Sequence, residues 1–220
     1  MIETIHGNVQ LYGLREKMNV GQERYVDSIM SNTITFCNAP AGTGKTTVAV
    51  AIAKYLHEKE GTGLTYIFAP IQEGSLGHRP GTQEEKESEY KAPLIDALLE
   101  LGELPDNAIK SESMPKDKQW VTAKSHTFMR GTNIKDQTVI IDEAQNFTRG
   151  ELKKILTRCH DSCRIIVIGH DGQNDLKNPS KSGFVPYLTH FEPEEYCGVV
   201  KLTESYRGEI SKKADELRWD

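Results

Sequence analysis

The sequence lacks three features that would each indicate a class of protein. Its four cysteines show no regular spacing, and Cys159 and Cys163 lack a matching pair of ligands, which speaks against a disulfide framework and a zinc site. With 27 Lys and Arg against 32 Asp and Glu, the net charge of -5 excludes a global attraction for nucleic acid or an anionic membrane. The longest apolar stretch, near VAVAIA, is far short of the roughly 20 residues that cross a bilayer.

No secretory signal is apparent in the opening MIETIHGNVQLYG, so we expect reduced thiols, a cytoplasmic location and no association with a membrane. The length of 220 residues suggests one domain spanning residues 1–220, with a core of about 20–208 and a long insert at 70–92. The insert is rich in Gly and Pro and then acidic, and connections of this length are usually functional or disordered. The last segment, GEISKKADELRWD, predicts a short amphipathic helix.

Strand-like and helix-like segments alternate along the chain. Runs of β-branched and apolar residues occur at TITFC, LTYIFA, WVTA, TVIID, RIIVIG and YCGVVKL. Between them lie KTTVAVAIAKYLHEK, APLIDALLEL and RGELKKILTRC, which have the pattern of helices. This alternation predicts an α/β fold, with a mostly parallel sheet covered by helices on both faces.

A glycine-rich loop connects the first of these strands to the first helix, in NAPAGTGKTTVAVAIA. Such a loop places backbone N–H groups and the positive end of a helix dipole around an anion. Lys45 would bind the β and γ phosphates of a nucleotide, and the Thr46 hydroxyl would bind Mg²⁺. Ala39 replaces the usual first glycine, which we expect the turn to tolerate; the alternative is an ordinary glycine-rich turn. The predicted nucleotide contacts in the loop are Pro40, Ala41, Gly42, Thr43, Gly44, Lys45, Thr46 and Thr47.

A pair of acids follows another predicted strand, in TVIIDEAQN. Because the carboxyl ends of the strands in an open α/β sheet form the ligand site, we expect Asp142 to orient Mg²⁺ together with Thr46. Glu143 would be the base that activates water. The next strand delivers Gln173 in GHDGQND, either as a switch that reports the γ-phosphate or as part of a polar turn.

Together these segments resemble the PhoH family of P-loop ATPases, which is similar to the first RecA-like domain of superfamily-one helicases. The likeness extends from about Gln22 to Arg207 and rests on PAGTGKT, GSLGHRPGTQEEK, APLIDALLEL, FMRG, VIIDEAQNFTRGELKKILTR, GHDGQNDL and LTESYRG. It implies a three-layer RecA-like fold and ATP as the nucleotide. It also implies that Gln22 reads the adenine edge, that Gln173 couples the γ-phosphate to bound nucleic acid, and that Arg207 neutralises the transferred phosphoryl group.

Three positions depart from the family pattern. The motif with Gln173 has His170 after Gly169, which displaces Asp171 by one residue and puts the role of that acid in doubt. Thr132 replaces a second arginine, and Ala69 replaces an arginine at the start of the insert. Weaker polynucleotide binding than in relatives is therefore expected. The resemblance to helicases suggests Arg79, Lys124 and Arg130 as contacts for a single strand.

Two functional hypotheses follow. In the first, the protein is an ATP hydrolase coupled to single-stranded RNA or DNA, as a helicase-like motor. A chain with room for one RecA-like domain would then form a homo-oligomeric ring, in which a neighbour completes the site. In the second, it is an ATP-dependent switch or adaptor that regulates a partner nuclease or ribonucleoprotein without separating strands. A kinase is disfavoured because Glu143 would activate water, which kinases must exclude.

Overall fold

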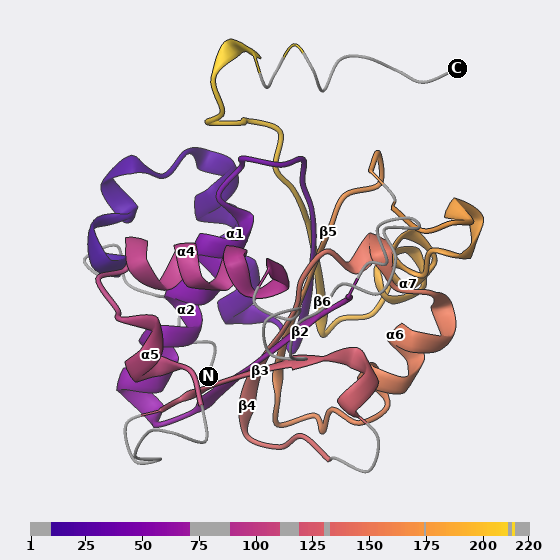
Figure 1. Cartoon of the computed structure of the whole chain (residues 1–220), viewed down its shortest axis with the longest axis horizontal. Coiled ribbons are helices and arrows are strands. Elements are labelled where there is room, and N and C mark those ends of the chain that lie inside the picture. Colours follow the sequence, from indigo (N-terminus) through magenta and orange to yellow (C-terminus); the bar gives the residue numbers. More distant parts are fainter. Residues whose placement is uncertain are drawn as a thin grey trace, which may run out of the picture.

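The computed structural model describes residues 10–70, 89–110, 119–129, 133–173, 175–210 and 213. Six parallel strands form one sheet in the order β3-β2-β4-β5-β1-β6 (Figure 1). The strands are β1 (Ile34–Asn38), β2 (Gly63–Phe68), β3 (Val121–Ser125), β4 (Gln137–Ile141), β5 (Arg164–Gly169) and β6 (Cys197–Lys201). Each of the six overlaps one of the predicted segments, with bounds that differ by at most two residues, and the described strands are entirely parallel rather than mostly so.

Helices cover both faces of the sheet, which makes three layers (Figure 1). One face carries α1 (Val20–Ser31), α2 (Lys45–Glu60), α4 (Ala92–Glu100) and the short α5 (Pro105–Ala108), and the other carries α6 (Arg149–Leu156) and α7 (Phe184–Phe191). The prediction of an α/β fold of the three-layer, RecA-like type is therefore confirmed.

Alternation of side chains along the strands divides the apolar residues between these two faces. In β1, Phe36 packs in the core beside α6 and α7, whereas Cys37 packs in the core beside α1 and α2. β2 follows the same rule: Tyr66 faces α2, and Ile67 faces the opposite layer. Because strands buried on both faces need apolar residues at nearly every position, these segments appear in the sequence as continuous apolar runs.

Two helices begin at capping boxes that fix where the chain enters them. The Asn19 side chain accepts the backbone N–H of Gln22 at 2.9 Å, and the backbone N–H of Asn19 donates to Gln22 Oε1 at 3.1 Å. Thr148 and Glu151 make the equivalent pair of bonds at the start of α6. These boxes satisfy N–H groups that the first helical turn would otherwise leave without partners.

Several predicted segments lie outside the described residues. They include residues 71–88 of the insert, Arg79, Arg130, Thr132 and most of the C-terminal segment 208–220. Within the described residues, none of the helices is long and apolar enough to cross a membrane.

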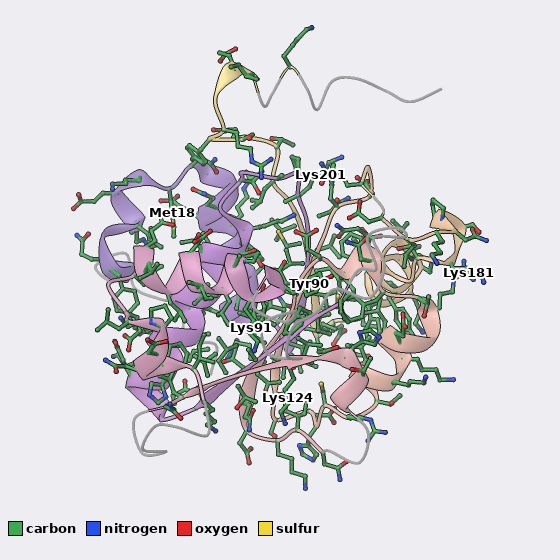
Figure 2. The ribbon with its side chains drawn as sticks, viewed as in Figure 1. Met18, Tyr90, Lys91, Lys124, Lys181 and Lys201 are labelled. Carbon is green, nitrogen blue, oxygen red and sulfur yellow. The ribbon has the colours of Figure 1, made fainter. Side chains whose placement is uncertain are left out.

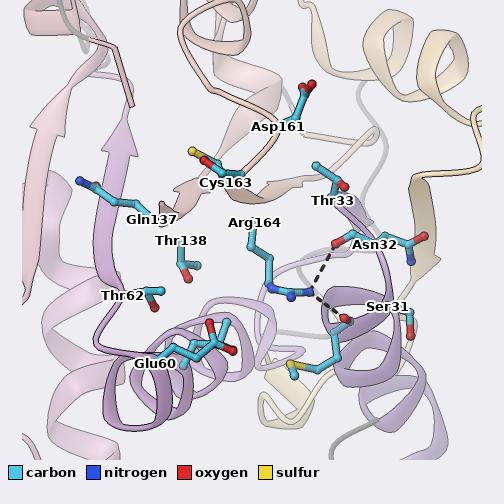
Figure 3. A pocket seen from close by; sticks show the side chains of 13 residues that line it. Ser31, Asn32, Thr33, Glu60, Thr62, Gln137, Thr138, Asp161, Cys163 and Arg164 are labelled. Carbon is cyan, nitrogen blue, oxygen red and sulfur yellow. Dashed lines mark hydrogen bonds between the residues drawn. The ribbon is translucent and has the colours of Figure 1, made fainter. Parts of the chain in front are cut away.

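A cavity of about 510 Å³ opens at the edge of the sheet where β1, β4 and β5 begin (Figure 3). Arg164 reaches into it and donates from one guanidinium nitrogen to the carbonyl oxygens of Ile29 and Met30, at 2.5 and 2.7 Å. This bond pattern satisfies carbonyl groups at the C-terminus of α1. The predicted site residues lie at the other edge, where the strands end, so cavity size alone does not mark the functional site.

Candidate active site

The glycine-rich loop leaves β1 at Asn38 and turns directly into α2, as predicted. Gly42 and Gly44 have φ angles of 76° and 72°, a region that glycine occupies without strain. Ala39 is fully buried and is not among the described residues with positive φ, so the turn accommodates its Cβ. Thr43 braces the loop by donating from its hydroxyl to the Pro40 carbonyl at 3.1 Å.

Lys45, the first residue of α2, folds back over this loop. Its side chain is buried, and Nζ donates to the Ala39 carbonyl at 3.1 Å and lies 3.5 Å from Glu143 Oε1. An ammonium group in this position is directed at the space enclosed by the loop. The cation of Lys45 and the carboxylate of Glu143 are therefore brought together from distant parts of the sequence.

Asp142 lies at the end of β4, where its N–H continues the ladder by donating to the Ile67 carbonyl at 3.0 Å. One carboxylate oxygen, Oδ2, accepts from Thr46 Oγ1 at 3.0 Å and from the Tyr66 hydroxyl at 2.6 Å. The other, Oδ1, accepts the Glu143 N–H at 2.9 Å. Burial raises the pKa of Asp142, as does the charge of Glu143, while the Tyr66 bond and Lys45 act in the opposite direction.

Glu143 adopts the left-handed conformation, with φ of 50° and ψ of 45°. Backbone strain of this kind costs on the order of 1–3 kcal/mol and is often found at functional sites. Its side chain is 42% exposed, and Oε2 accepts a short hydrogen bond from Gln145 Nε2. Gln145 is itself buried, and its Oε1 accepts the backbone N–H of His170, which follows β5. The Glu143 carboxylate is thus held between Lys45 and the turn after β5.

The turn after β5 is attached at two further points. Asn38 and Asp171 exchange a reciprocal pair of hydrogen bonds, at 2.9 and 3.2 Å, which ties the turn to the residue before the glycine-rich loop. Asn146 and Asp175 exchange another pair, at 3.1 and 2.9 Å. The displaced acid Asp171 therefore has a structural partner in this chain. Gln173 lies half-exposed between these two attachments.

The segment 202–207 crosses the other side of the loop. Ser205 Oγ donates to the Ala41 carbonyl at 3.1 Å, and the Tyr206 N–H donates to the Gly42 carbonyl at 2.8 Å. The stem of Arg207 lies so close that a Cβ placed on Gly42 would be 2.4 Å from its Cγ. Arg207 is exposed beside the loop, and its predicted contact with a phosphate stays a prediction.

Gln22 is buried beside the loop, and both ends of its amide have partners. Nε2 donates to the Thr43 carbonyl at 3.0 Å, and Oε1 accepts from the Asn19 backbone and from the Tyr206 hydroxyl at 3.1 and 3.3 Å. A pocket of about 390 Å³ lies next to this amide. It is lined by residues from five parts of the chain, namely Leu14, Lys17, Met18, Gln22, Gly42, Gly44, Thr47, Val48, Glu100 and Tyr206.

A second pocket, of about 290 Å³, lies where β2 and β3 end and where the turns after β4 and β5 meet. Lys177 and Lys181 stand on its rim, together with His126, whose Nε2 is 3.2 Å from Glu151 Oε1. Lys124 does not line this pocket; it is half-buried on the edge strand β3. Figure 2 shows Lys124 and Lys181 well apart in this view.

Several residues of this region carried no signal in the sequence. In the sequence, Tyr66 is one residue of the strand-like run LTYIFA. Tyr206 is part of the motif LTESYRG, in which only Arg207 was expected to have a role. Asn38, Gln145 and Asn146 are common polar residues at strand ends. Only the short distances between strand ends in the folded chain show what these side chains contact.

Comparison with known proteins gives a consistent result. The family model described as PhoH-like protein matches residues 16–216. A PhoH-like protein of Mycobacterium leprae is 36% identical over 180 residues, which is 79% of this chain and 50% of that protein. Protein PhoH of Escherichia coli K12 is 30% identical over 187 residues, 84% of this chain and 52% of that protein. The chain thus spans about half the length of these relatives.

Solved structures with little sequence identity share the fold. The large terminase of a thermophilic bacteriophage superposes with a TM-score of 0.55 at 12% identity, over 95% of this chain and 48% of that one. The DUF1998 helicase MrfA, in a structure bound to DNA, gives a TM-score of 0.51 at 10% identity, over 90% of this chain and 30% of that one. At such identities the likeness concerns the fold.

Proposed function

Because this chain belongs to the family of PhoH-like proteins and has a P-loop ATPase fold, we propose that it binds Mg·ATP and hydrolyses it in a cycle coupled to single-stranded nucleic acid. One observation carries the proposal. The glycine-rich loop, the Lys45 ammonium group, the Thr46 hydroxyl and the two acids after β4 meet at one place, although 96 residues separate Thr46 from Asp142.

The residues present fit a magnesium nucleotide. Backbone N–H groups of the loop and the N-terminus of α2 would surround the β-phosphate, with Lys45 bridging to the γ-phosphate. Thr46 Oγ1 and the Asp142 carboxylate supply the hard oxygen donors that Mg²⁺ requires. When bound, the ion would neutralise charge on the phosphates and align them for attack.

Glu143 is the residue that we assign as general base. Its half-exposed carboxylate faces the loop beside Lys45, and Gln145 fixes its orientation. In the proposed reaction it accepts a proton from water as the water oxygen bonds to the γ-phosphorus, while the bond from that phosphorus to the β–γ bridging oxygen breaks and ADP leaves. Arg207 would neutralise charge on the transferred phosphoryl group, and Gln173 would report the presence of the γ-phosphate to the turn after β5.

The adenine would occupy the 390 Å³ pocket beside Gln22. In the described structure both ends of the Gln22 amide already have partners. Because Nε2 has two N–H groups and donates one of them to Thr43, the other could donate to the adenine edge, whereas acceptance of a base N–H by Oε1 would require it to exchange its bond with Asn19 or with Tyr206. The exposed Tyr206 ring, at the mouth of the pocket, supplies an apolar surface for the purine.

Coupling to nucleic acid is supported by the pocket at the ends of β2 and β3. Lys177 and Lys181 offer cationic contacts to a phosphodiester backbone, and Asn146, which lines the same pocket, lies three residues from Glu143. A strand bound there would act on the turn that carries the base. Because one RecA-like domain presents only half of a helicase-type site, we also propose that the chain assembles as a homo-oligomeric ring.

Steady-state ATP hydrolysis, measured with and without single-stranded RNA and DNA, tests this function. Lys45→Ala should lose nucleotide affinity. Glu143→Gln should bind ATP normally but hydrolyse it roughly 10²- to 10⁴-fold more slowly. The matched control is Glu195→Gln, an exposed acid just before β6 at the opposite edge of the sheet.

The outcomes separate the hypotheses. Stimulation several-fold by a single strand supports the motor, whereas slow hydrolysis that no polymer stimulates supports an ATP-dependent switch or adaptor. Wild-type hydrolysis by Glu143→Gln would refute the assignment of the base. A mass in solution equal to the monomer in every nucleotide state would refute the ring.

A further inference from the structure

A buried phenol reaches the acid that we assign to the metal site. Tyr66 lies in the middle of β2, paired with Ala123 of β3 and Ile140 of β4, and its side chain is 1% exposed. Asp142 follows β4 directly and is two residues beyond Ile140, and its N–H continues the ladder, so both side chains project to the same face of the sheet as Tyr66. That face carries α2, which begins with Lys45 and Thr46.

The Tyr66 hydroxyl donates to Asp142 Oδ2 at 2.6 Å, within the range of 2.5–2.7 Å typical of a hydroxyl bonded to a carboxylate. The same oxygen accepts from Thr46 at 3.0 Å, and the other oxygen accepts the Glu143 N–H at 2.9 Å. Thr46 and Glu143 belong to the face of the site that receives the nucleotide. Tyr66 approaches from the core.

We propose that Tyr66 is a positioning residue for the metal site, which holds the Asp142 carboxylate in one orientation through its phenolic hydrogen bond. This inference rests on the proposed function, because it takes Asp142 to orient Mg²⁺. Tyr66 itself contacts neither metal nor nucleotide. When Mg²⁺ binds, Thr46 would turn its hydroxyl oxygen toward the ion and no longer donate to Asp142. The Tyr66 hydroxyl would still donate to the buried Asp142 carboxylate and keep its orientation fixed.

The presence of a tyrosine at position 66, rather than an aliphatic residue, supports its role in positioning Asp142. An aliphatic residue would fill this position of a buried strand without a polar atom, whereas a buried hydroxyl is unfavourable unless it has a partner. Here the partner is the one carboxylate at the site that is completely buried. Hydrogen-bonded groups behind metal ligands typically change metal affinity by about 10- to 100-fold when they are removed.

Tyr66→Phe removes only the hydroxyl and provides the test. A fluorescent ADP analogue is bound to the full chain in EDTA, and Mg²⁺ is then titrated. We expect affinity in EDTA to stay within about two-fold of wild type, and the Mg²⁺ concentration at half-maximal response to rise about 10-fold or more. The control is Tyr25→Phe, since Tyr25 is a fully buried phenol of α1 that has no hydrogen bond to Asp142.

An unchanged Mg²⁺ midpoint in a folded Tyr66→Phe protein, or an equal shift in Tyr25→Phe, overturns the proposal. Asp142→Asn separates this failure from failure of the proposed function. If Asp142→Asn raises the midpoint and Tyr66→Phe does not, only the role of Tyr66 is wrong. If Asp142→Asn leaves the midpoint unchanged, the metal site is wrong. Should Tyr66→Phe not fold, a fluorotyrosine incorporated at Tyr66 keeps the ring and its packing but changes the hydroxyl as a donor, and an unchanged Mg²⁺ midpoint in that protein overturns the proposal.

Discussion

The contact between the glycine-rich loop and the segment 205–207 leads to a quantitative prediction for Gly42→Ala. A Cβ at this position would lie 2.4 Å from Arg207 Cγ, whereas carbon atoms pack at about 3.5–4.0 Å. The Arg207 stem must therefore shift by about 1.1–1.6 Å. A misplacement of about 1 Å at a catalytic group can reduce a rate on the order of 10²-fold. We expect a fall of about that size in kcat for ATP hydrolysis.

The control is Gly61→Ala, because Gly61 has nearly the same φ, 73° against 76°, but has nothing within 4 Å of its Cβ. Either alanine costs about 1–2 kcal/mol in a left-handed conformation. Both variants should therefore melt roughly 2–8 °C below wild type. Only Gly42→Ala should lose activity, because only there does the side chain displace Arg207.

Phosphate release at saturating ATP measures the effect, and a double variant identifies its route. If Gly42→Ala acts through the arginine, then adding it to Arg207→Ala should cost little more than Arg207→Ala alone. A Gly42→Ala enzyme with a kcat within about three-fold of that of Gly61→Ala would refute the reasoning. Fully additive losses would show that the glycine acts on the phosphates and not through Arg207.

Three further predictions concern the elements around the site. Thr148→Ala removes the capping box of α6 and should lower the free energy of unfolding by about 1 kcal/mol in a denaturant titration. Burial by itself raises the pKa of Glu151. Hydrogen bonds from Thr148 and the neighbouring His126 outweigh this effect, so the pKa of Glu151 lies below its ordinary value. Its stabilising contribution is therefore present above about pH 4.3 and lost as pH falls through the folded pKa, so Glu151→Gln should flatten the acid limb of a stability–pH curve. For the bond from Asn38 Nδ2 to Asp171 Oδ2, a double-mutant cycle with alanine should give a coupling energy of about 1 kcal/mol, and a value near zero would show that this side-chain bond does not help to hold the turn after β5.

The strands and the loop between β1 and α2 could be predicted from the sequence because their signals are local. Apolar runs bounded by turn residues indicate buried strands, and a loop with Lys45 and Thr46 before a helix indicates a phosphate site whatever surrounds it. The helices α1, α5 and α7 were not among the predicted segments. Phe184–Phe191 of α7 contains a proline and has no capping signal. The roles predicted for Gln22, Gln173 and Arg207 remain predictions, although the structure brings all three to the same edge of the sheet.

The sequence by itself determined the order of the strands, three of the helices, the phosphate-type loop and the acids at the end of a strand, because periodicity and turn chemistry act between neighbouring residues. Only the tertiary structure decided which side chains meet. The strand order places β2 beside β4, and this register brings Tyr66 to Asp142 across 76 residues of sequence. In the same way the segment after β6 returns to the glycine-rich loop because β6 pairs with β1. Such contacts depend on strand pairing, which no local pattern records.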